Sequence, residues 1–325
     1  MNHTHDVYDV IIIGAGPSGL ACAIEAKKHQ LNYLVIDKGC LVNSIFHFPT
    51  NLIFFSTPEL LEIGNIPLII QTEKPTRADM LKYYRRVAQH YELHIHLFEA
   101  VYAVEKSGDL FSVNTAKGHY STKNVVLATG QYDTPNLMNI PGENLSKVHH
   151  YYDEAHPYYQ KKVAVIGGKN SAVETALELF HNGADVTLIH RHETFGKSVK
   201  YWILPDIQNR IKEGKIKAYF NTTVKEIREK SLVLNVADGR EIELENDVVF
   251  AMTGYLPDRP FLKEIGIQFD ETMTPVHHPK TLESNVPCVY IAGVLTAGRD
   301  GSKVFIENSR NHGVKIIGNI LNGQK

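Results

Sequence analysis

The sequence predicts an α/β protein in which two folds of the same kind follow one another, the second inserted into the first. Three observations predict this architecture. A strand, a glycine-rich turn, a helix and a second strand occur in that order near the N-terminus, and the same order returns around Gly167. The 325 residues suffice for about two domains of ordinary size. The last segment, 257–325, is too short to bury a core alone, so we expect it to rejoin the first domain.

The first fold begins with an apolar, β-branched strand at 7–13, which leads into the turn Gly14-Ala15-Gly16-Pro17-Ser18-Gly19. A helix is predicted at 20–28 and a second strand at 33–36, ending in Asp37. In this Rossmann-like pattern the first glycine makes a tight turn and the second lets the backbone approach a pyrophosphate. The third lets the helix pack on the sheet, and the acid accepts ribose hydroxyls. The first fold is therefore expected to bind a nucleotide with an unphosphorylated ribose.

The second fold repeats the pattern with two changes. A strand at 162–166 leads into Gly167-Gly168-Lys169-Asn170-Ser171-Ala172, a helix through about Asn182 and a strand at 185–189. The basic triplet His190-Arg191-His192 replaces the acid, and an arginine there accommodates a ribose 2′-phosphate that an acid would repel. Lys169 replaces the second glycine, where it either pairs with phosphate or obstructs it. We expect NADP(H) here, with a degenerate repeat that binds nothing as the alternative.

The remaining segments connect the two folds. Thr76 is the expected N-cap of an amphipathic helix that runs to about Tyr91. A helix is also expected from about Val304 to Leu321, and further strands near 94–104, 110–115, 125–128, 248–250 and 289–292. Ala128-Thr129-Gly130 and Ala251-Met252-Thr253-Gly254 are near copies that resemble crossovers between domains. We therefore expect 1–133 and 257–325 to form the first domain and 134–256 the second.

Composition and charge exclude several classes of function. Lys and Arg number 34 against 36 Asp and Glu, so the chain offers no basic footprint for nucleic acid or a membrane surface. No apolar run approaches the roughly 20 residues of a transmembrane helix. Residues 1–9 lack a signal peptide's features, and a cytoplasmic protein is expected. Cys22, Cys40 and Cys288 form no C-x-x-C pair, and the 17 histidines show no ligand spacing, so no metal is expected.

These motifs together resemble the FAD- and NADPH-dependent thioredoxin-reductase type of pyridine-nucleotide oxidoreductase, over essentially the whole chain. The redox dithiol of that type is missing, and residues 149–157 of this chain stand in its place without a cysteine. More specific segments resemble the bacillithiol disulfide reductase branch. They are Gly167–Ala172, Phe54-Phe55-Ser56-Thr57, Leu61-Glu62-Ile63-Gly64, Lys200-Tyr201-Trp202-Ile203-Leu204-Pro205, Phe305-Ile306-Glu307-Asn308-Ser309-Arg310 and His312-Gly313.

The resemblance implies a three-layer ββα fold in which an NADPH domain is inserted in an FAD domain. It implies NADPH-dependent reduction of a low-molecular-weight thiol disulfide, bacillithiol disulfide, directly from flavin without a protein dithiol. The implied FAD-binding residues are Gly14, Gly16, Pro17, Ser18, Gly19, Asp37, Lys38, Thr129, Gly130, Gly293, Phe305 and Ile306. The implied NADPH-binding residues are Gly167, Gly168, Lys169, Asn170, Ser171, Ala172, His190, Arg191, His192, Thr253 and Gly254. A small thiol disulfide or a redox protein is the expected partner, and a homo-oligomer, a dimer or larger, is the expected assembly.

The candidates for direct chemistry are few. Members of the branch often have cysteine at the position of Ser18, where it has been proposed as redox-active, and a serine cannot form a mixed disulfide. Cys22 is expected to be a buried helix residue and Cys288 structural. Cys40 is read as an ordinary loop thiol, with a loop that approaches the flavin as the alternative. His47 lies in the stretch 43–56, which either forms the wall of a substrate pocket or is an apolar loop.

Three cations are candidates for substrate carboxylates, with solvated surface as the alternative: Lys197, Lys200 and Arg299. Val294 stands where the family has an acid, so one ribityl contact is expected to be absent. The backbone of Phe305 and Ile306, at the start of the last helix, is expected to stabilise negative charge on the reduced flavin.

Three other functions stay open. A ferredoxin- or flavodoxin-NADP reductase would use the same scaffold without a dithiol. A flavin monooxygenase is disfavoured because the F-x-G-x-x-x-H fingerprint is not met around Gly142 and His149. The third alternative is a flavoprotein without catalytic activity that senses redox state or serves as a partner.

Overall fold

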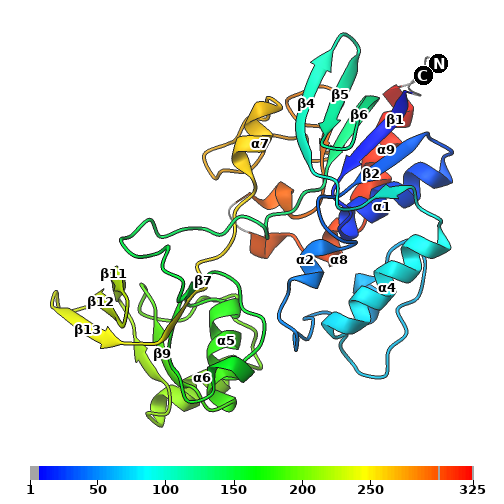
Figure 1. Ribbon diagram of the computed structural model, residues 1–325. Coiled ribbons are helices and arrows are strands. Elements are labelled where there is room, and N and C mark those ends of the chain that lie inside the picture. The colour runs from blue at the N-terminus through cyan, green and yellow to red at the C-terminus, as the bar shows by residue number, and fades with distance from the viewer. Residues whose placement is uncertain (1–6, 299–300, 324–325) are drawn as a thin grey trace. The chain divides into compact units, whose positions relative to one another are not determined.

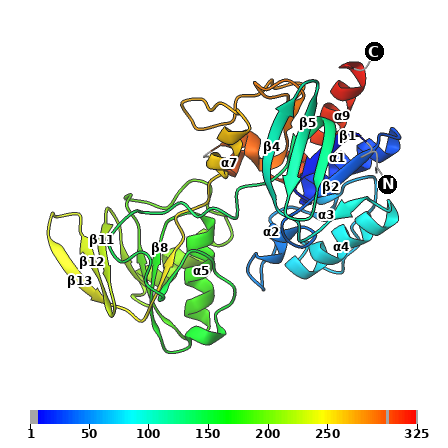
Figure 2. The same ribbon diagram turned by 45° about the horizontal axis from the view of Figure 1, so that its top comes forward.

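The computed structural model describes residues 7–298 and 301–323. They form two compact units, of which the first combines the chain up to Phe48 with 52–134 and the chain from Tyr255 onward. The second unit comprises 49–51 and 135–254. Each unit has its own sheet and its own helices (Figures 1 and 2). Within the described residues no helix is long and apolar enough to cross a membrane.

The first unit is built on a parallel sheet in the order β3-β2-β1-β6, with β15 beside the second half of β6. The first half of β6 pairs instead with β5 in an antiparallel meander, β4-β5-β6. The strand bounds are β1 (Tyr8–Ile13), β2 (Tyr33–Ile36), β3 (Ile95–His96), β4 (Val101–Ser107), β5 (Leu110–Thr115), β6 (His119–Leu127) and β15 (Val289–Ile291). The pairing of β15 with β6 returns the C-terminal segment to the first unit.

Alternate residues of β1 face opposite sides of this sheet, which produces three layers. Val10 and Ile12 pack with α1 (Pro17–Lys28) and α9 (His312–Gly323). Ile11 and Ile13 pack with the meander instead, including Val113. Figures 1 and 2 show β4 and β5 across the face of the sheet that α1 and α9 leave open. Burying each large aliphatic side chain of this kind stabilises the fold by about 1.5–3 kcal/mol.

Two helices of the first unit show their sequence signals directly. Thr76 Oγ1 accepts the N–H of Asp79 at 3.2 Å and Asp79 Oδ2 accepts that of Thr76 at 3.0 Å, a capping box that starts α4 (Arg77–His90) at the predicted N-cap. Gly313 lets α9 approach α1, because a Cβ there would lie 2.5 Å from the Ala21 carbonyl oxygen. The unit's shorter helices are α2 (Asn43–Phe46), α3 (Pro58–Leu61), α7 (Arg259–Glu264), α8 (Ile306–Ser309), η2 (Gly293–Ala297) and η3 (Gly301–Lys303).

The second unit has a parallel sheet, β10-β9-β8-β14-β7, and a separate antiparallel sheet, β11-β12-β13. The helix α5 (Asn170–His181) packs on the parallel sheet through Val173, Ala176 and Leu179. The parallel strands are β7 (Val148–His149), β8 (Lys162–Ile166), β9 (Asp185–Ile189), β10 (Lys217–Tyr219) and β14 (Val248–Ala251). The remaining elements are β11 (Thr223–Arg228), β12 (Ser231–Asn235), β13 (Glu241–Glu245), α6 (Leu204–Lys212) and η1 (His156–Tyr158). The sequence patterns did not predict β7 or β10–β13.

The expectation of one C-terminal helix from about Val304 to Leu321 is wrong. The chain forms α8 and α9 with a break at Arg310 and Asn311. Asn308 Oδ1 accepts the N–H of Phe305 at 2.9 Å, which starts α8 one residue later. Beyond it, Arg310 donates to the carbonyl oxygens of Glu59 and Glu62, a tertiary contact made where the helix stops.

The expectation of one strand near 94–104 is also wrong. The chain makes β3 and β4, separated by Phe98, whose φ of +54° lies in the left-handed region. A residue in that conformation cannot continue a strand. The strand predicted at 125–128 is the end of the much longer β6, because its earlier half pairs with β5 in the meander.

Candidate functional site

The glycine turn of the first unit leaves the backbone open at one point. Gly14 has a φ of +111°, and a Cβ there would lie 2.3 Å from the Ala128 carbonyl oxygen. A Cβ on Gly19 would lie 1.9 Å from the Gly14 carbonyl oxygen, so both residues are held to glycine by backbone. Gly16, the N-cap of α1, has nothing within 4 Å of such a Cβ. The open backbone at this helix N-terminus fits the pyrophosphate of a dinucleotide.

Asp37 is fixed against this turn by its backbone. Its Oδ2 accepts the N–H of Ala15 at 2.7 Å, and its Oδ1 accepts that of Gly39 at 2.8 Å. Burial raises the pKa of Asp37, and these two N–H groups oppose that shift. Each carboxylate oxygen keeps acceptor capacity for a ribose hydroxyl. The neighbouring Lys38 pairs with Asp133 at 2.9 Å.

The end of β6 carries a buried hydroxyl without a partner. Among the residues that the structure describes, none hydrogen bonds to Thr129 Oγ1 or to Gln131 Oε1. A Cβ on Gly14 would lie 3.2 Å from the Thr129 amide nitrogen, which places Thr129 beside the glycine turn. Leaving a buried hydroxyl unsatisfied costs about 1–3 kcal/mol, a cost that a bound polar group removes. Thr129 therefore fits a ligand that lies along the turn, and Gln131 is a polar neighbour that the sequence motifs did not single out. Between them Gly130 has a φ of +70°.

The C-terminal segment lies against the same turn. Ser18 Oγ donates to Ser309 Oγ at 3.1 Å, and a Cβ on Gly293 would lie 2.8 Å from Ser18 Oγ. The Gly293 N–H donates to His312 Nδ1 at 3.1 Å. Ser18 stands at the position where members of the branch often have a cysteine. In this chain its hydroxyl joins α1 to α8.

The expected role of Phe305 needs a correction. Its N–H already donates to Asn308 Oδ1 at 2.9 Å, and α8 is only four residues long, from Ile306 to Ser309. The Ile306 side chain packs against the core beside α4. The backbone of Phe305 is therefore not a free donor for a reduced ring. Val294, in η2, is half-buried.

The branch-specific segments of the first unit meet one another. Ser56 hydrogen bonds to Glu307, which joins the Phe54–Thr57 segment to α8. Arg310 Nη1 donates to the carbonyl oxygens of Glu59 at 2.5 Å and Glu62 at 3.2 Å. These contacts hold α8 on α3, so the segments resembling the bacillithiol disulfide reductase branch form one connected region.

Burial works against thiolate formation at all three cysteines. Cys22 is fully buried, as expected, and burial raises the pKa of its thiol to about 12. Burial and the nearby Asp37 raise the pKa of Cys40, whose Sγ lies 3.6 Å from Asn43 Oδ1. Burial likewise raises the pKa of Cys288. A reactive cysteine has the opposite shift. Within the described ranges no group of His, Cys, Asp and Glu is arranged to hold a metal ion.

His47 is exposed at the end of α2, where its carbonyl oxygen accepts the hydroxyl of Tyr132 at 3.0 Å. Its ring lies 5.0 Å from that of Phe46. These contacts show a backbone role for His47 and leave its imidazole at the surface.

The glycine turn of the second unit is partly covered. Gly167 has a φ of +146°, and a Cβ there would lie 2.6 Å from the Met252 carbonyl oxygen. A Cβ on Gly168 would lie 2.3 Å from the ring of His190, so that ring lies directly on the turn. Lys169 is exposed and is the N-cap of α5, in extended backbone that any residue adopts. Lys169 thus holds the N-cap position that Gly16 holds in the first unit.

The basic triplet divides into one buried and two exposed side chains. Burial lowers the pKa of His190, which is 9% exposed and packs against Phe195. Arg191 and His192 are exposed, and Arg191 Nε donates to His192 Nε2 at 3.2 Å. Arg191 and His192 are therefore available to an anion, whereas His190 is a packing contact of the turn.

The other polar candidates of the second unit have partners within it. Asn170 Oδ1 accepts the N–H of Lys200 at 2.8 Å, and its Nδ2 donates to the Ser198 carbonyl oxygen at 2.9 Å. Lys200 pairs with Glu174, and Thr253 Oγ1 donates to the Asn136 carbonyl oxygen at 2.7 Å. Ser171 and Lys197 are exposed, Ala172 is buried, and Gly254 has a φ of +94°. Arg299 lies outside the described residues.

Comparison with known proteins agrees with these features. The chain matches the family model described as pyridine nucleotide-disulphide oxidoreductase over residues 11–293. It is 45% identical to bacilliredoxin reductase Bdr of Bacillus subtilis (strain 168) over 312 residues, which are 95% of this chain and 96% of that protein. The solved structure of bacillithiol disulfide reductase Bdr (YpdA) from Staphylococcus aureus superposes with a TM-score of 0.95 at 41% identity, over 98% of this chain and 100% of that one.

A thioredoxin reductase from T. acidophilum superposes with a TM-score of 0.78 at 22% identity, over 98% of each chain, a likeness that shows the fold. The predicted thioredoxin-reductase-like architecture is thereby confirmed. The chain belongs to the pyridine nucleotide-disulphide oxidoreductase family and, within it, to the branch of the bacillithiol disulfide reductases, which makes it a flavoprotein oxidoreductase.

Proposed function

We propose that this protein uses NADPH to reduce bacillithiol disulfide, with FAD in the first unit and NADPH in the second. The observation that carries the proposal is the contrast between the two glycine turns. One is followed by a carboxylate, Asp37, held on the turn, and the other by the exposed pair Arg191 and His192. An acid selects an unphosphorylated ribose, and a guanidinium accommodates a 2′-phosphate.

The residues of the first unit bind and orient. Gly16 leaves room for a pyrophosphate at the N-terminus of α1, Asp37 accepts ribose hydroxyls, and Thr129 Oγ1 gains the partner that it lacks. When bound, FAD would accept a hydride from NADPH and pass two electrons to the disulfide, which takes up two protons and leaves as two thiols. The sequence contains no C-x-x-C pair, so the disulfide has to meet the flavin without a protein dithiol between them.

In the second unit the exposed Arg191 and His192 would hold the 2′-phosphate, and Lys169, the exposed N-cap of α5, would pair with the pyrophosphate. The 45% identity to bacilliredoxin reductase Bdr of Bacillus subtilis supports a place for this reaction in the bacilliredoxin system. We therefore include a bacilliredoxin mixed disulfide as a second acceptor of the same reducing centre. A homo-oligomer remains part of the proposal.

Anaerobic stopped-flow spectroscopy of the purified protein tests the assignment. NADPH should bleach the flavin absorbance much faster than NADH does, and bacillithiol disulfide should then restore it. Restoration only by ferredoxin or flavodoxin would contradict the disulfide assignment and leave the fold and the cofactors standing. Failure of NADPH to bleach the flavin would contradict the enzymatic assignment altogether.

A further inference from the structure

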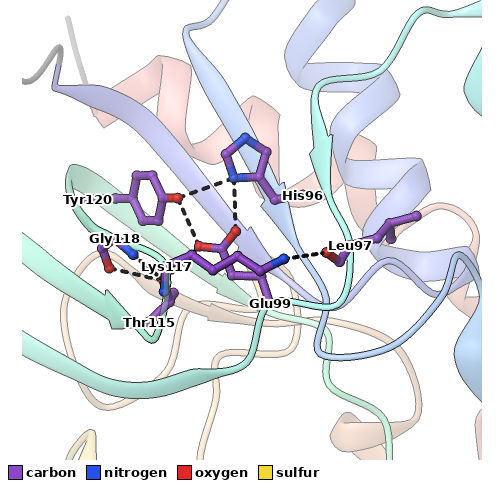
Figure 3. Close-up of polar contacts among 7 residues, drawn as sticks. All are labelled: His96, Leu97, Glu99, Thr115, Lys117, Gly118 and Tyr120. Atoms are coloured by element: carbon purple, nitrogen blue, oxygen red, sulfur yellow. Dashed lines mark hydrogen bonds and ion pairs between the residues drawn. The ribbon is translucent and has the colours of Figure 1, made fainter.

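A buried carboxylate lies beside Asp37, outside the residues considered so far. Glu99 is 4% exposed and sits between β3 and β4. Figure 3 shows its carboxylate with the side chains of His96, Thr115 and Tyr120 around it. Its Oε1 accepts Thr115 Oγ1 at 2.6 Å and the Tyr120 hydroxyl at 2.8 Å, and its Oε2 lies 3.2 Å from His96 Nδ1. A carboxylate this deeply buried is found where donors satisfy it.

The direction of the Thr115 hydrogen bond follows from its other partners. Thr115 Oγ1 accepts the N–H groups of Lys117 at 3.2 Å and Gly118 at 3.0 Å. Its one hydrogen is therefore donated, and Glu99 at 2.6 Å is closer than the Gly118 carbonyl oxygen at 3.0 Å. Thr115 belongs to β5 and Tyr120 to β6, so two strands of the meander hold Glu99.

The backbone around Glu99 holds Asp37 in turn. The Glu99 N–H donates to the Asp37 carbonyl oxygen at 2.9 Å, and the Asp37 N–H donates to the His96 carbonyl oxygen at 2.9 Å. Between them the Phe98 N–H donates to the Gly39 carbonyl oxygen at 3.0 Å. Phe98 has a φ of +54°, a conformation that a bulky residue keeps only when its surroundings impose it. The backbone hydrogen bonds of Phe98 and Glu99 hold the turn on one side, and the Glu99 side chain ties it to the meander on the other.

The charge of Glu99 depends on the same donors. Burial acts to raise the pKa of Glu99, but the Thr115 and Tyr120 hydroxyls, His96 and Lys117 together bring it below its ordinary value. The effect on the tyrosine is opposite, since burial and the hydrogen bond to Glu99 raise the pKa of Tyr120 to about 12. Glu99 is thus an ionised acceptor that needs its hydroxyl donors in order to stay in this position.

We propose that Glu99, with Thr115 and Tyr120, is a positioning network that fixes the Asp37 corner and thereby sets the affinity for the adenosine half of FAD. In this proposal Glu99 acts through the backbone of Asp37 and Gly39, to which its turn is hydrogen bonded. The inference rests on the proposed FAD site of the first unit and is independent of the identity of the disulfide.

The test uses the variants Thr115→Val and Tyr120→Phe, which remove one hydroxyl each and keep nearly the same shape. Apoprotein prepared from each is titrated with FAD, followed by flavin fluorescence, and with ADP as a competitor. We expect the Kd for FAD and that for ADP to rise together by about tenfold in each variant, the effect of one lost hydrogen bond. Thr115→Ser keeps the hydroxyl and should restore the wild-type affinity.

Matched controls separate positioning from general stability. Thr122→Val removes a buried hydroxyl of β6 that donates to the carbonyl oxygens of Tyr8 and Asn124. Tyr290→Phe removes a buried tyrosine hydroxyl that accepts from Asn319 on α9. Each apoprotein's melting temperature is recorded beside its affinities, so that a variant which only loosens the fold is recognised.

The outcomes are distinct. FAD affinities of Thr115→Val and Tyr120→Phe that fall no further than those of the two controls would overturn the inference. So would a loss of FAD affinity without a loss of ADP affinity, because the network acts on the adenosine side. If the wild-type protein and the variants all bind FAD with the same affinity, the inference is wrong and the proposed function is unaffected. A wild-type protein without affinity for FAD would sink the proposed function with it.

Discussion

The two glycine turns have the same geometry, but an acidic side chain packs on the first and a histidine ring on the second. In each unit the residue after the second strand contacts the residue that follows the first glycine of the turn. In the first unit Asp37 Oδ2 accepts the Ala15 N–H at 2.7 Å. In the second unit the ring of His190 lies so close to Gly168 that a Cβ on Gly168 would be 2.3 Å from it. The comparison shows that the position held by an acid in the first unit can be held by a packed aromatic ring in the second. The exposed positive charge of the second unit then lies on the next residue, Arg191.

The threonines that end the two central strands differ in the same way. Thr253 Oγ1 is satisfied by the Asn136 carbonyl oxygen at 2.7 Å, so it closes the end of its own unit. Thr129 Oγ1 is buried without a partner among the described residues, so it is left for a ligand. The first turn thus has open backbone at Gly16 and an unsatisfied hydroxyl at Thr129. In the second unit the side chain of His190 covers the turn, and Thr253 already has a partner.

The largest effect should come from exchanging the third glycine of the first turn, Gly19. Gly19→Ala places a Cβ 1.9 Å from a backbone oxygen, and we expect the free energy of unfolding to fall by about 3 kcal/mol or more. Gly16→Ala meets nothing within 4 Å, so stability should stay within about 0.5 kcal/mol while FAD affinity falls. Urea unfolding of both apoproteins and FAD titration measure the two effects. Equal destabilisation by both substitutions would refute this difference between the two glycines.

The second effect concerns the choice of cofactor. Arg191→Ala removes the exposed guanidinium, and we expect kcat/KM for NADPH to fall by about a hundredfold, as for a charge-assisted hydrogen bond of ~2–3 kcal/mol. The kcat/KM for NADH should change little, since NADH lacks the 2′-phosphate. Arg228→Ala, which removes an exposed arginine paired with Glu226 and Glu243 elsewhere in the unit, is the control. An equal loss for both cofactors would show that Arg191 does not read the phosphate.

The contact between Gly168 and His190 gives a third, smaller effect. Gly168→Ala should lower the free energy of unfolding of the second unit by about 1–3 kcal/mol, because its Cβ displaces the His190 ring. His190→Ala makes room for that Cβ, so the double variant should be more stable than the sum of the two single effects. A double-mutant cycle by thermal or urea unfolding measures this coupling. Additive effects would mean that the ring does not restrain the turn.

The smallest effect is a pH dependence in the first unit. Burial lowers the pKa of His312 from 6.5 to about 4, and its Nδ1 accepts the Gly293 N–H. The unfolded chain therefore binds the proton more readily, so stability is full above pH 6.5 and falls as the pH drops toward 4. His312 is buried, and between pH 6.5 and pH 5 the loss is on the order of 1–2 kcal/mol. Urea unfolding of wild type and His312→Gln at several pH values measures it, and parallel curves would contradict this assignment.

Local patterns predicted much of the fold around the two glycine turns. The boundaries of β2, β8 and β9 were predicted from their apolar runs, and Thr76 was predicted as the N-cap of α4. The capping box that Thr76 forms with Asp79 was not predicted. Three positions of the glycine turns have neighbours that explain their residue type: Gly14, Gly19 and Gly167. These features are readable because each depends on residues close together in the chain or on a steric demand that only glycine meets.

Other features had no local signal. The break between α8 and α9 depends on Arg310, which donates to carbonyl oxygens of Glu59 and Glu62 far away in the sequence. The turn at Phe98 is followed by Glu99, whose donors come from β5 and β6. A helical period continues through the break between α8 and α9, and an alternating strand pattern continues through the turn at Phe98. Periodicity alone therefore predicts one helix and one strand there.

The sequence by itself determined the two turns, their order, the acid after one and the basic triplet after the other, because these follow from glycine geometry and charge. Only the tertiary structure decided which members of those groups are available. It buried His190 and exposed Arg191, left the Thr129 hydroxyl without a partner, and gave the Phe305 N–H to Asn308. The physical reason is that a polar group's partners in a folded chain are set by which strands and helices pack together, and that packing joins residues distant in sequence.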